Sequence, residues 1–240
     1  MEKIINFDNL RSFCYTNAYL VGEARGIAIS FFGLGGAAMY SEDPAEAKAL
    51  AEKGIVYMIP YYDPWCWMNR QAVDYVDEIV DVIVRHYGMK DPKIVSSGGS
   101  MGGLSSLVYA AYARITPVMV VSNCPVCDLP YHFTERPDLP RTLYAAFGGY
   151  DGTMDEAMRS ASPLHLALEK KMPYIKYRIL HCTADQAVNK EKHSDRLVGA
   201  LKSGGYDIEY TAVPGRGHCD LTPEMREKYD GYITDGALDG

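Results

Sequence analysis

The sequence contains no uninterrupted apolar run of about 20 residues, the length that a membrane-spanning helix requires. Its first residues mix polar and apolar side chains, so we expect no signal peptide. Basic residues are outnumbered, with 24 Lys and Arg against 31 Asp and Glu, and the formal net charge is −7. No run of Lys and Arg interrupts this balance. We therefore expect neither a membrane nor a nucleic acid as a partner of this chain.

Cysteine is also scarce, with six residues in 240, and no secretory signal accompanies them. Such cysteines are typical of free thiols in a reducing compartment, which predicts a cytoplasmic protein. The hydrophobic share of 48% and the charged share of 23% are ordinary for a globular chain. A length of 240 residues suffices for one substantial domain and is short for two, so we expect residues 1–240 to form a single domain.

Apolar runs that favour strands alternate with helical patterns along most of the chain. This alternation predicts an α/β fold, a mainly parallel sheet with helices on both faces, in which ligands bind at the edge where the strand-to-helix loops emerge. The expected strands are residues 26–32, 55–59, 94–95, 118–122, 177–181 and 208–213. The expected helices are residues 45–53, 72–87, 104–113, 191–202 and one that begins at Pro223.

The connecting segment over residues 125–173 is rich in Pro, Tyr and Gly and has a weaker pattern. We expect it to be partly irregular, with short helices near residues 154–159 and 164–171. Two interpretations of this segment stay open. It is either an insertion that covers the binding edge as a cap, or a plain surface excursion.

A first glycine loop, Gly33-Leu34-Gly35-Gly36-Ala37-Ala38, follows a strand and matches the dinucleotide fingerprint G-x-G-x-x-G/A. Asp63, after the next strand, lies near the position of a ribose-binding acid. The fingerprint requires a helix that begins within the glycines, so that its N-terminus faces the pyrophosphate. Here Ser41, Asp43 and Pro44 place the helix start several residues later. Nucleotide binding by the Gly33 loop is therefore a minor alternative.

A second glycine loop lies within Lys93–Ala110, KIVSSGGSMGGLSSLVYA, between a strand and a helix. Residues 98–106 contain no Lys, which excludes a phosphate-binding P-loop. Gly98-Gly99-Ser100-Met101-Gly102 instead fits G-x-S-x-G, the tight elbow that exposes a nucleophilic serine. A glycine-rich packing turn with an incidental serine is the simpler alternative.

The elbow requires an acid and then a histidine, each directly after a later strand. Asp185 follows the strand that ends near His181, and His218 follows the strand that ends near Val213. A turn acid and a surface histidine are each common. Three suitable residues in the required order at three strand ends are rarely a coincidence, so we expect Ser100, Asp185 and His218 to form a catalytic triad.

Acyl transfer also requires backbone N–H groups that stabilise the oxyanion. The residue after the nucleophile, Met101, is expected to supply one donor. The loop after an early strand is expected to supply the other, and there we favour Leu34, with Gly33 as the alternative.

These motifs make the chain resemble an α/β-hydrolase, similar to small esterases and to the catalytic domains of prolyl-oligopeptidase-type peptidases. The resemblance rests on residues 98–103, Ser162-Pro163-Leu164, residues 181–188 and Gly217-His218. It implies the α/β-hydrolase fold and an acyl-enzyme formed on Ser100. Two features depart from the pattern. Phe32-Gly33 stands where a His-Gly pair is common, and the short N-terminal part implies reduced first strands.

The resemblance favours a serine hydrolase, a carboxylesterase for a small acyl ester more than a prolyl-oligopeptidase-like peptidase or amidase. A non-catalytic ligand-binding hydrolase fold is a further alternative. Substrate contacts are expected from the two tryptophans of the chain, Trp65 and Trp67, which follow a strand. Ordinary loop packing explains them equally well. Arg141 is a weaker candidate, for binding a substrate carboxylate.

Cys124-Pro-Val-Cys127 has the spacing of a redox pair, but it follows a late strand. Cys182 and Cys219 also follow strands and lie beside histidines, a combination that would suit a zinc site. Neither a second C-x-x-C nor a tight Cys/His spacing is present. We therefore interpret these cysteines as structural thiols, and we expect no metal and no cofactor.

Overall fold

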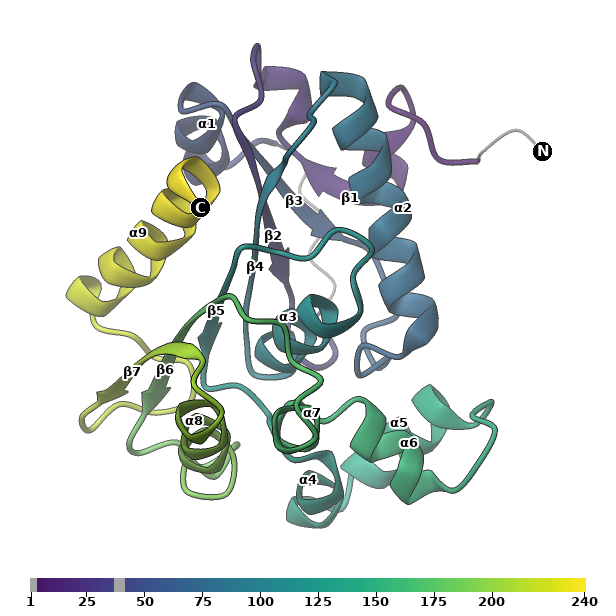
Figure 1. The fold of residues 1–240 in the computed structure, drawn as a ribbon, viewed down its shortest axis with the longest axis vertical. Coiled ribbons are helices and arrows are strands. Elements are labelled where there is room, and N and C mark those ends of the chain that lie inside the picture. The colour runs from purple at the N-terminus through teal and green to yellow at the C-terminus, as the bar shows by residue number, and fades with distance from the viewer. Residues whose placement is uncertain (1–3, 37–41) are drawn as a thin grey trace.

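The computed structural model describes residues 4–36 and 42–240. A seven-stranded sheet with the order β1-β3-β2-β4-β5-β6-β7 forms its centre (Figure 1). The strands are β1 (Cys14–Thr16), β2 (Gly26–Phe31), β3 (Ile55–Pro60), β4 (Lys93–Gly99), β5 (Met119–Asn123), β6 (Lys176–Cys182) and β7 (Asp207–Val213). All neighbours pair in parallel except β1, which pairs antiparallel with β3. This confirms the mainly parallel sheet, and the three-residue β1 agrees with reduced first strands.

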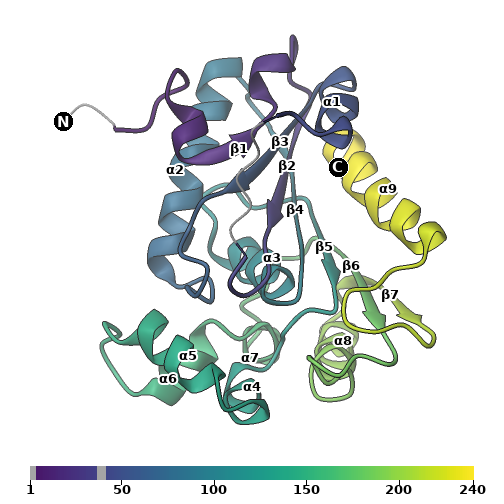
Figure 2. The same cartoon turned by 180° about the vertical axis from the view of Figure 1, so that it is seen from behind.

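Helices cover both faces of the sheet, as predicted. The strands alternate in the side chains that they present: Ile27 and Ile29 pack with α2 and α3, whereas Ala28 packs on the opposite face with α9. Figures 1 and 2 show α1 and α9 together on one side of the sheet and α2, α3 and α8 on the other. These helices are α1 (Ala45–Glu52), α2 (Arg70–Tyr87), α3 (Met101–Tyr112), α8 (Ser194–Ser203) and α9 (Pro223–Asp239).

Local sequence accounts for the ends of the longest of these core helices. The Asn69 side chain accepts a hydrogen bond from Ala72 N–H at the start of α2, and Gly88 ends the helix in the left-handed conformation. Helix α1 begins at Ala45 with Pro44 before it. Ser41, which the sequence suggested as part of that start, lies outside the described residues.

The connecting segment is more regular than the sequence predicted, because it contains four helices. They are α4 (Leu129–Glu135), α5 (Leu139–Phe147), α6 (Met154–Ser160) and α7 (Pro163–Leu168). The two short helices near residues 154 and 164 were predicted, whereas α4 and α5 were not. Figures 1 and 2 show α4, α5 and α6 gathered beyond the carboxyl ends of the central strands, so this segment lies at the edge where the loops of interest emerge.

No helix in the part of the chain that the structure describes combines the length and the apolar character needed to cross a membrane.

Candidate active site

Ser100 occupies a sharp turn between β4 and α3. Its backbone angles, φ 60° and ψ −124°, lie in a region that side-chain-bearing residues rarely adopt. Glycines make this turn possible, because a Cβ on Gly102 would lie 2.1 Å from the carbonyl oxygen of Phe31 and one on Gly98 would lie 2.4 Å from that of Gly102. The strand and the helix therefore pack too closely for any side chain at these positions. This is the local geometry of a nucleophile elbow.

Asp185 lies in the loop after β6, and its side chain is fully buried. Its Oδ1 atom accepts hydrogen bonds from the N–H groups of Ala187 and Val188, at 2.8 and 3.0 Å. Burial alone would raise the pKa of Asp185, but hydrogen bonds from His181, His218 and these two amides hold it well below its usual range. The carboxylate is therefore ionised and fixed in orientation.

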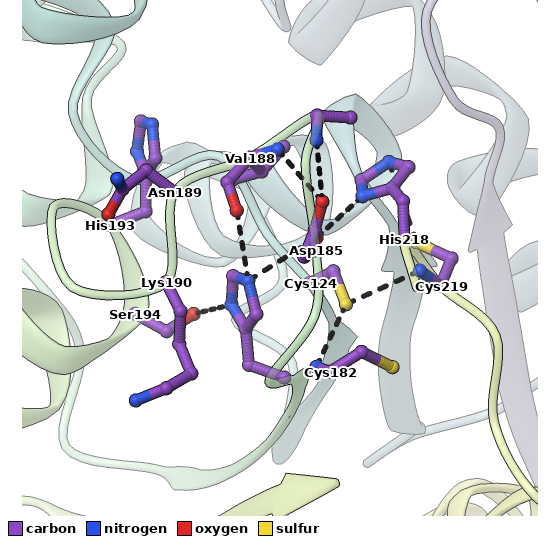
Figure 3. A network of polar contacts seen from close by, with 12 residues as sticks. Cys124, Cys182, Asp185, Val188, Asn189, Lys190, His193, Ser194, His218 and Cys219 are labelled. Atoms are coloured by element: carbon purple, nitrogen blue, oxygen red, sulfur yellow. Dashed lines mark hydrogen bonds and ion pairs between the residues drawn. The ribbon is translucent and has the colours of Figure 1, made fainter. Parts of the chain in front are cut away.

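His218 lies in the loop after β7, and its Nδ1 donates to Asp185 Oδ2 at 2.7 Å (Figure 3). This bond leaves Nε2 with a lone pair on the side of the ring away from Asp185. Burial lowers the pKa of His218, but the bond to Asp185 and the nearby Cys124 thiol outweigh it and raise the pKa to about 9. Two predicted partners from separate loops are thus in contact.

The Ser100 turn lies against the His218 loop. The carbonyl oxygen of Asn123 accepts hydrogen bonds from both Ser100 N–H, at 3.0 Å, and Cys219 Sγ, at 3.5 Å. A Cβ on Gly99 would lie 3.1 Å from Cys219 Sγ. Among the described residues, no hydrogen bond joins the Ser100 hydroxyl to His218. Catalytic hydrogen bonds are often looser before substrate binds.

The first glycine loop approaches Ser100 as the oxyanion argument requires. A Cβ on Gly33 would lie 3.8 Å from Ser100 Cβ. Leu34 follows in the same turn, which a hydrogen bond from Gly36 N–H to Gly33 O closes at 2.9 Å. Met101 is the first residue of α3, so its N–H has no intrahelical acceptor. Among the described residues, the first helix after this loop begins at Ala45, so none of them places a helix N-terminus at the glycines, as nucleotide binding requires.

His181 contacts the predicted acid, a role that the sequence interpretation did not assign to it. Its ring is fully buried, with Nδ1 2.7 Å from Ser194 Oγ and Nε2 3.2 Å from Val188 O. Nε2 also lies 3.4 Å from Asp185 Oδ2. The ring thus connects α8 to the turn that carries the acid. The only indication of this contact in the sequence is that His181 lies four residues before Asp185.

The two tryptophans have different roles. Trp65 is 40% exposed, and its ring packs against Gly35, where a Cβ would lie 3.1 Å from it. Trp67 is fully buried and donates from Nε1 to Thr142 Oγ1 at 2.9 Å, which anchors α5 to the body. The burial of Trp67 does not support the expectation that it contacts substrate, whereas Trp65 lines a cavity.

A cavity of about 1130 Å³ lies between the loop after β3, the start of α2 and the helices α5 and α6. Its aromatic lining comes from Tyr61, Tyr62, Trp65, Tyr75, Tyr112, Phe147 and Tyr150. Arg70 and Arg141 contribute cationic groups. Ser100, Asp185 and His218 are not lining residues. Trp65, which lines the cavity, packs against Gly35 in the loop whose Gly33 lies near Ser100.

Cys124, Cys182 and Cys219 converge beside His218, whereas Cys127 of the C-x-x-C pair does not join them (Figure 3). Cys124 Sγ accepts hydrogen bonds from the N–H groups of Cys182 and Cys219, at 3.3 and 3.4 Å. All six cysteines are free thiols, as expected. The interpretation of these four as structural thiols did not anticipate that Cys124 and Cys219 lie close to His218, while Cys182 contacts the sulfur of Cys124 through its N–H group.

The sheet order, the tight turn at Ser100 and the paired acid and histidine are features of the α/β-hydrolase fold. The chain matches the prolyl oligopeptidase family over residues 67–232 and belongs to it, with a catalytic domain of the prolyl-oligopeptidase type. No curated protein sequence matches the chain.

Solved structures share the fold at low identity. A puromycin-hydrolyzing peptidase of Mycobacterium tuberculosis is 18% identical with a TM-score of 0.71, and the match covers 91% of this chain and 35% of that one. This chain therefore spans about a third of that peptidase. A truncated carbohydrate esterase from gut microbiota is 16% identical with a TM-score of 0.65, covering 90% and 87% of the two chains. Thermogutta terrifontis esterase 2, phosphonylated by cyclosarin, is 19% identical with a TM-score of 0.60, covering 95% and 90%.

Proposed function

We propose that the protein is a carboxylesterase that cleaves small acyl esters with Ser100 as nucleophile, His218 as general base and Asp185 as the acid that orients it. The observation that carries the proposal is the 2.7 Å hydrogen bond between Asp185 and His218, on loops adjacent to a serine in a strained turn. A fixed, ionised carboxylate beside His218 holds the imidazole in the tautomer whose Nε2 accepts a proton.

In the proposed reaction Ser100 Oγ attacks the acyl carbonyl while His218 Nε2 takes the hydroxyl proton. The N–H groups of Met101 and Leu34 stabilise the oxyanion, and removal of one such donor typically lowers the rate by about 10²–10³. His218 then gives the proton to the departing alcohol. A water molecule, deprotonated by the same histidine, releases the acid from Ser100.

The aromatic cavity supports binding of one part of the substrate beside the reacting ester. Trp65 forms part of its wall and packs on Gly35, next to the proposed oxyanion donors. Flat aromatic walls favour an aromatic or other apolar substituent through offset stacking. Arg141 is placed to pair with a carboxylate on the same substrate.

The esterase assignment is supported by two structures that the match covers over 87% and 90% of their own chains, both of which are esterases. A peptidase or amidase is the second candidate, favoured by the family to which the chain belongs and by the puromycin-hydrolyzing peptidase. The same triad serves both reactions, because each proceeds through an acyl-enzyme.

Intact mass after treatment with a fluorophosphonate tests the proposal. We expect one adduct on the wild type and none on Ser100→Ala. Ser105→Ala, which removes a buried hydroxyl from the same helix, is the matched control and should label like the wild type. Absence of an adduct on folded wild type would contradict the triad and favour a non-catalytic ligand-binding protein.

Ester and amide preference is then measured with a p-nitrophenyl ester and a p-nitroanilide that share one acyl group. The esterase proposal expects turnover of the ester alone. Comparable kcat/KM values for both substrates would instead favour the peptidase.

A further inference from the structure

Three potential metal ligands converge at the proposed base. Cys124 Sγ, a ring nitrogen of His218 and Cys219 Sγ all lie within 4.8 Å of one another, and His218 Nε2 is 3.8 Å from Cys219 Sγ. Donor atoms around a tetrahedral Zn²⁺, with bonds of about 2.0–2.3 Å, are separated by roughly 3.5–3.8 Å. The distance between His218 Nε2 and Cys219 Sγ therefore nearly equals the separation of two ligands bound to one Zn²⁺. We infer that Cys124, His218 and Cys219 form a Zn²⁺ site that captures the general base and inhibits the enzyme.

Without a metal Cys124 is a protonated thiol, because the hydrogen bond with the Cys219 thiol and burial raise its pKa. Its backbone contacts nonetheless favour a thiolate once a metal displaces that proton. Its Sγ accepts two backbone N–H groups, from Cys182 and Cys219 (Figure 3). Hydrogen bonds of this kind favour the charged form of an acceptor. Both Cys124 and Cys219 have positive φ angles, 46° and 56°, which place these residues in unusual turns after β5 and β7. The sulfur of Cys124 is therefore oriented before any metal arrives.

His218 is oriented for the same purpose by its partner. Histidines that bind zinc commonly donate the other ring N–H to a carboxylate, which fixes the tautomer and makes the ligating nitrogen more basic. Asp185 accepts that proton at 2.7 Å, so Nε2 presents its lone pair toward Cys219. The arrangement that would make His218 a general base thus also makes it a zinc ligand.

One of the three ligands lines a cavity, and the site has a free coordination position. Cys219 is half-exposed and lines a cavity of about 400 Å³ together with Gly99 and Asn123. Three protein ligands leave a fourth position for water, as in other open zinc sites. Binding would release one proton from each thiol, so that Zn²⁺ and two thiolates give a neutral centre.

A second group of potential ligands, His132, Glu135 and His193, differs in its protonation. His193 Nδ1 accepts N–H groups from Cys127 and Asp128, at 3.0 and 3.1 Å. Its proton must then lie on Nε2, which donates to Glu135 at 2.8 Å. With that nitrogen protonated, His193 cannot bind a metal. This group is a hydrogen-bonded contact between α4 and the start of α8.

The metal site rests on these contacts alone, whereas inhibition also rests on the proposed function. The test therefore has two independent readouts on the full chain. Co²⁺ replaces Zn²⁺ as a spectroscopic probe, and we expect a thiolate-to-metal charge-transfer band, one equivalent of metal per chain, and displacement by Zn²⁺. Fluorophosphonate labelling is measured in parallel, with and without Zn²⁺, and we expect Zn²⁺ to slow it.

Cysteine variants show whether the metal binds at Cys124 and Cys219 or at another thiol of the chain. Cys219→Ala, at a half-exposed position that tolerates substitution better than the buried Cys124, should lose the band and weaken the Zn²⁺ effect by about tenfold or more, since loss of even an outer-shell partner weakens metal binding about 10–100-fold. Cys124→Ser should do the same. Cys14→Ser removes a buried thiol in β1 and should respond to both metals like the wild type.

The outcomes are distinguishable. A wild type without a charge-transfer band, or a band that survives in Cys219→Ala, overturns the zinc site whatever the labelling shows. A band that disappears in both variants supports the site, even if Ser100 proves unreactive, a result that would refute only the proposed function. Labelling that Zn²⁺ leaves unchanged in a protein with an intact band would refute inhibition.

Discussion

Asp185 and His218 are joined by a 2.7 Å hydrogen bond although 33 residues separate them in the chain. Each side chain stands directly after a strand, and β6 and β7 are parallel neighbours, with Cys182 opposite Val213 in register. The pairing of the two strands therefore brings the two loops together at one edge of the sheet. The contact follows from topology rather than from local sequence.

Replacing Asp185 with Asn tests this contact. An amide at this position keeps the volume but no longer favours the Nδ1–H tautomer, so we expect kcat/KM to fall by about 10⁴. Asp220→Asn is the matched control, since Asp220 is an exposed acid two residues after His218 that pairs with Arg216. Steady-state kinetics on both variants, with thermal unfolding to confirm that each is folded, provides the measurement. Equal activities would contradict the role of Asp185.

The pH dependence of activity depends on His218. A general base must be neutral, and the hydrogen bond to Asp185 raises the pKa of His218 to about 9, so protonated imidazole persists through neutral pH. The acid limb of kcat/KM against pH is therefore displaced above the ordinary histidine range, and activity should still rise between pH 7 and 9. In Asp185→Asn the residual activity should show this limb at lower pH. A wild-type profile that is already flat above pH 7 would argue against the raised pKa.

Much of the fold and of the candidate site was predictable from the sequence, because the signals are local. β-Branched runs define the strands, and the glycines around Ser100 leave few conformations other than a tight turn. The order of serine, acid and histidine could be read directly. The helices α4 and α5 were missed, although Asp128 and Asp138 precede prolines at the second helical positions and thereby signal two helix starts.

Other features could not be predicted because they depend on packing between distant segments. Strand β1 is too short to show a period, and only its pairing with β3 defines it. The burial of Trp67 depends on Thr142, 75 residues away. The cluster of Cys124 and Cys219 beside His218 similarly requires the loops after β5 and β7 to meet, which spacing along the chain does not show.

The close packing at the elbow predicts a strong effect of a single methyl group. Gly102→Ala would place a Cβ 2.1 Å from the carbonyl oxygen of Phe31, and neither backbone can yield without displacing α3 from β2. We expect a loss of stability at or beyond the upper end of the ~1–3 kcal/mol typical of overpacking, together with loss of fluorophosphonate labelling. Urea unfolding measures the first effect and intact mass the second.

Gly199→Ala is the control for that substitution. Gly199 lies within α8, and a Cβ there would meet no atom within 4 Å. Alanine in a helix interior is favoured over glycine by roughly 0.5–1 kcal/mol, so this variant should be slightly more stable than the wild type. If Gly102→Ala and Gly199→Ala unfold at the same urea concentration, the close contact between α3 and β2 is not a constraint.

The two tryptophans give a matched pair of substitutions with opposite expectations. Trp67→Phe removes the hydrogen bond to Thr142 and part of a fully buried ring, so we expect a loss of about 2 kcal/mol in the free energy of unfolding. Trp65→Phe alters a partly exposed ring and should change stability by less than about 0.5 kcal/mol.

Because Trp65 lines the proposed substrate cavity, Trp65→Phe should raise KM for an aromatic ester by about tenfold. Urea unfolding and steady-state kinetics on both variants separate the two roles. A larger change in KM in Trp67→Phe than in Trp65→Phe would place the substrate elsewhere than in this cavity.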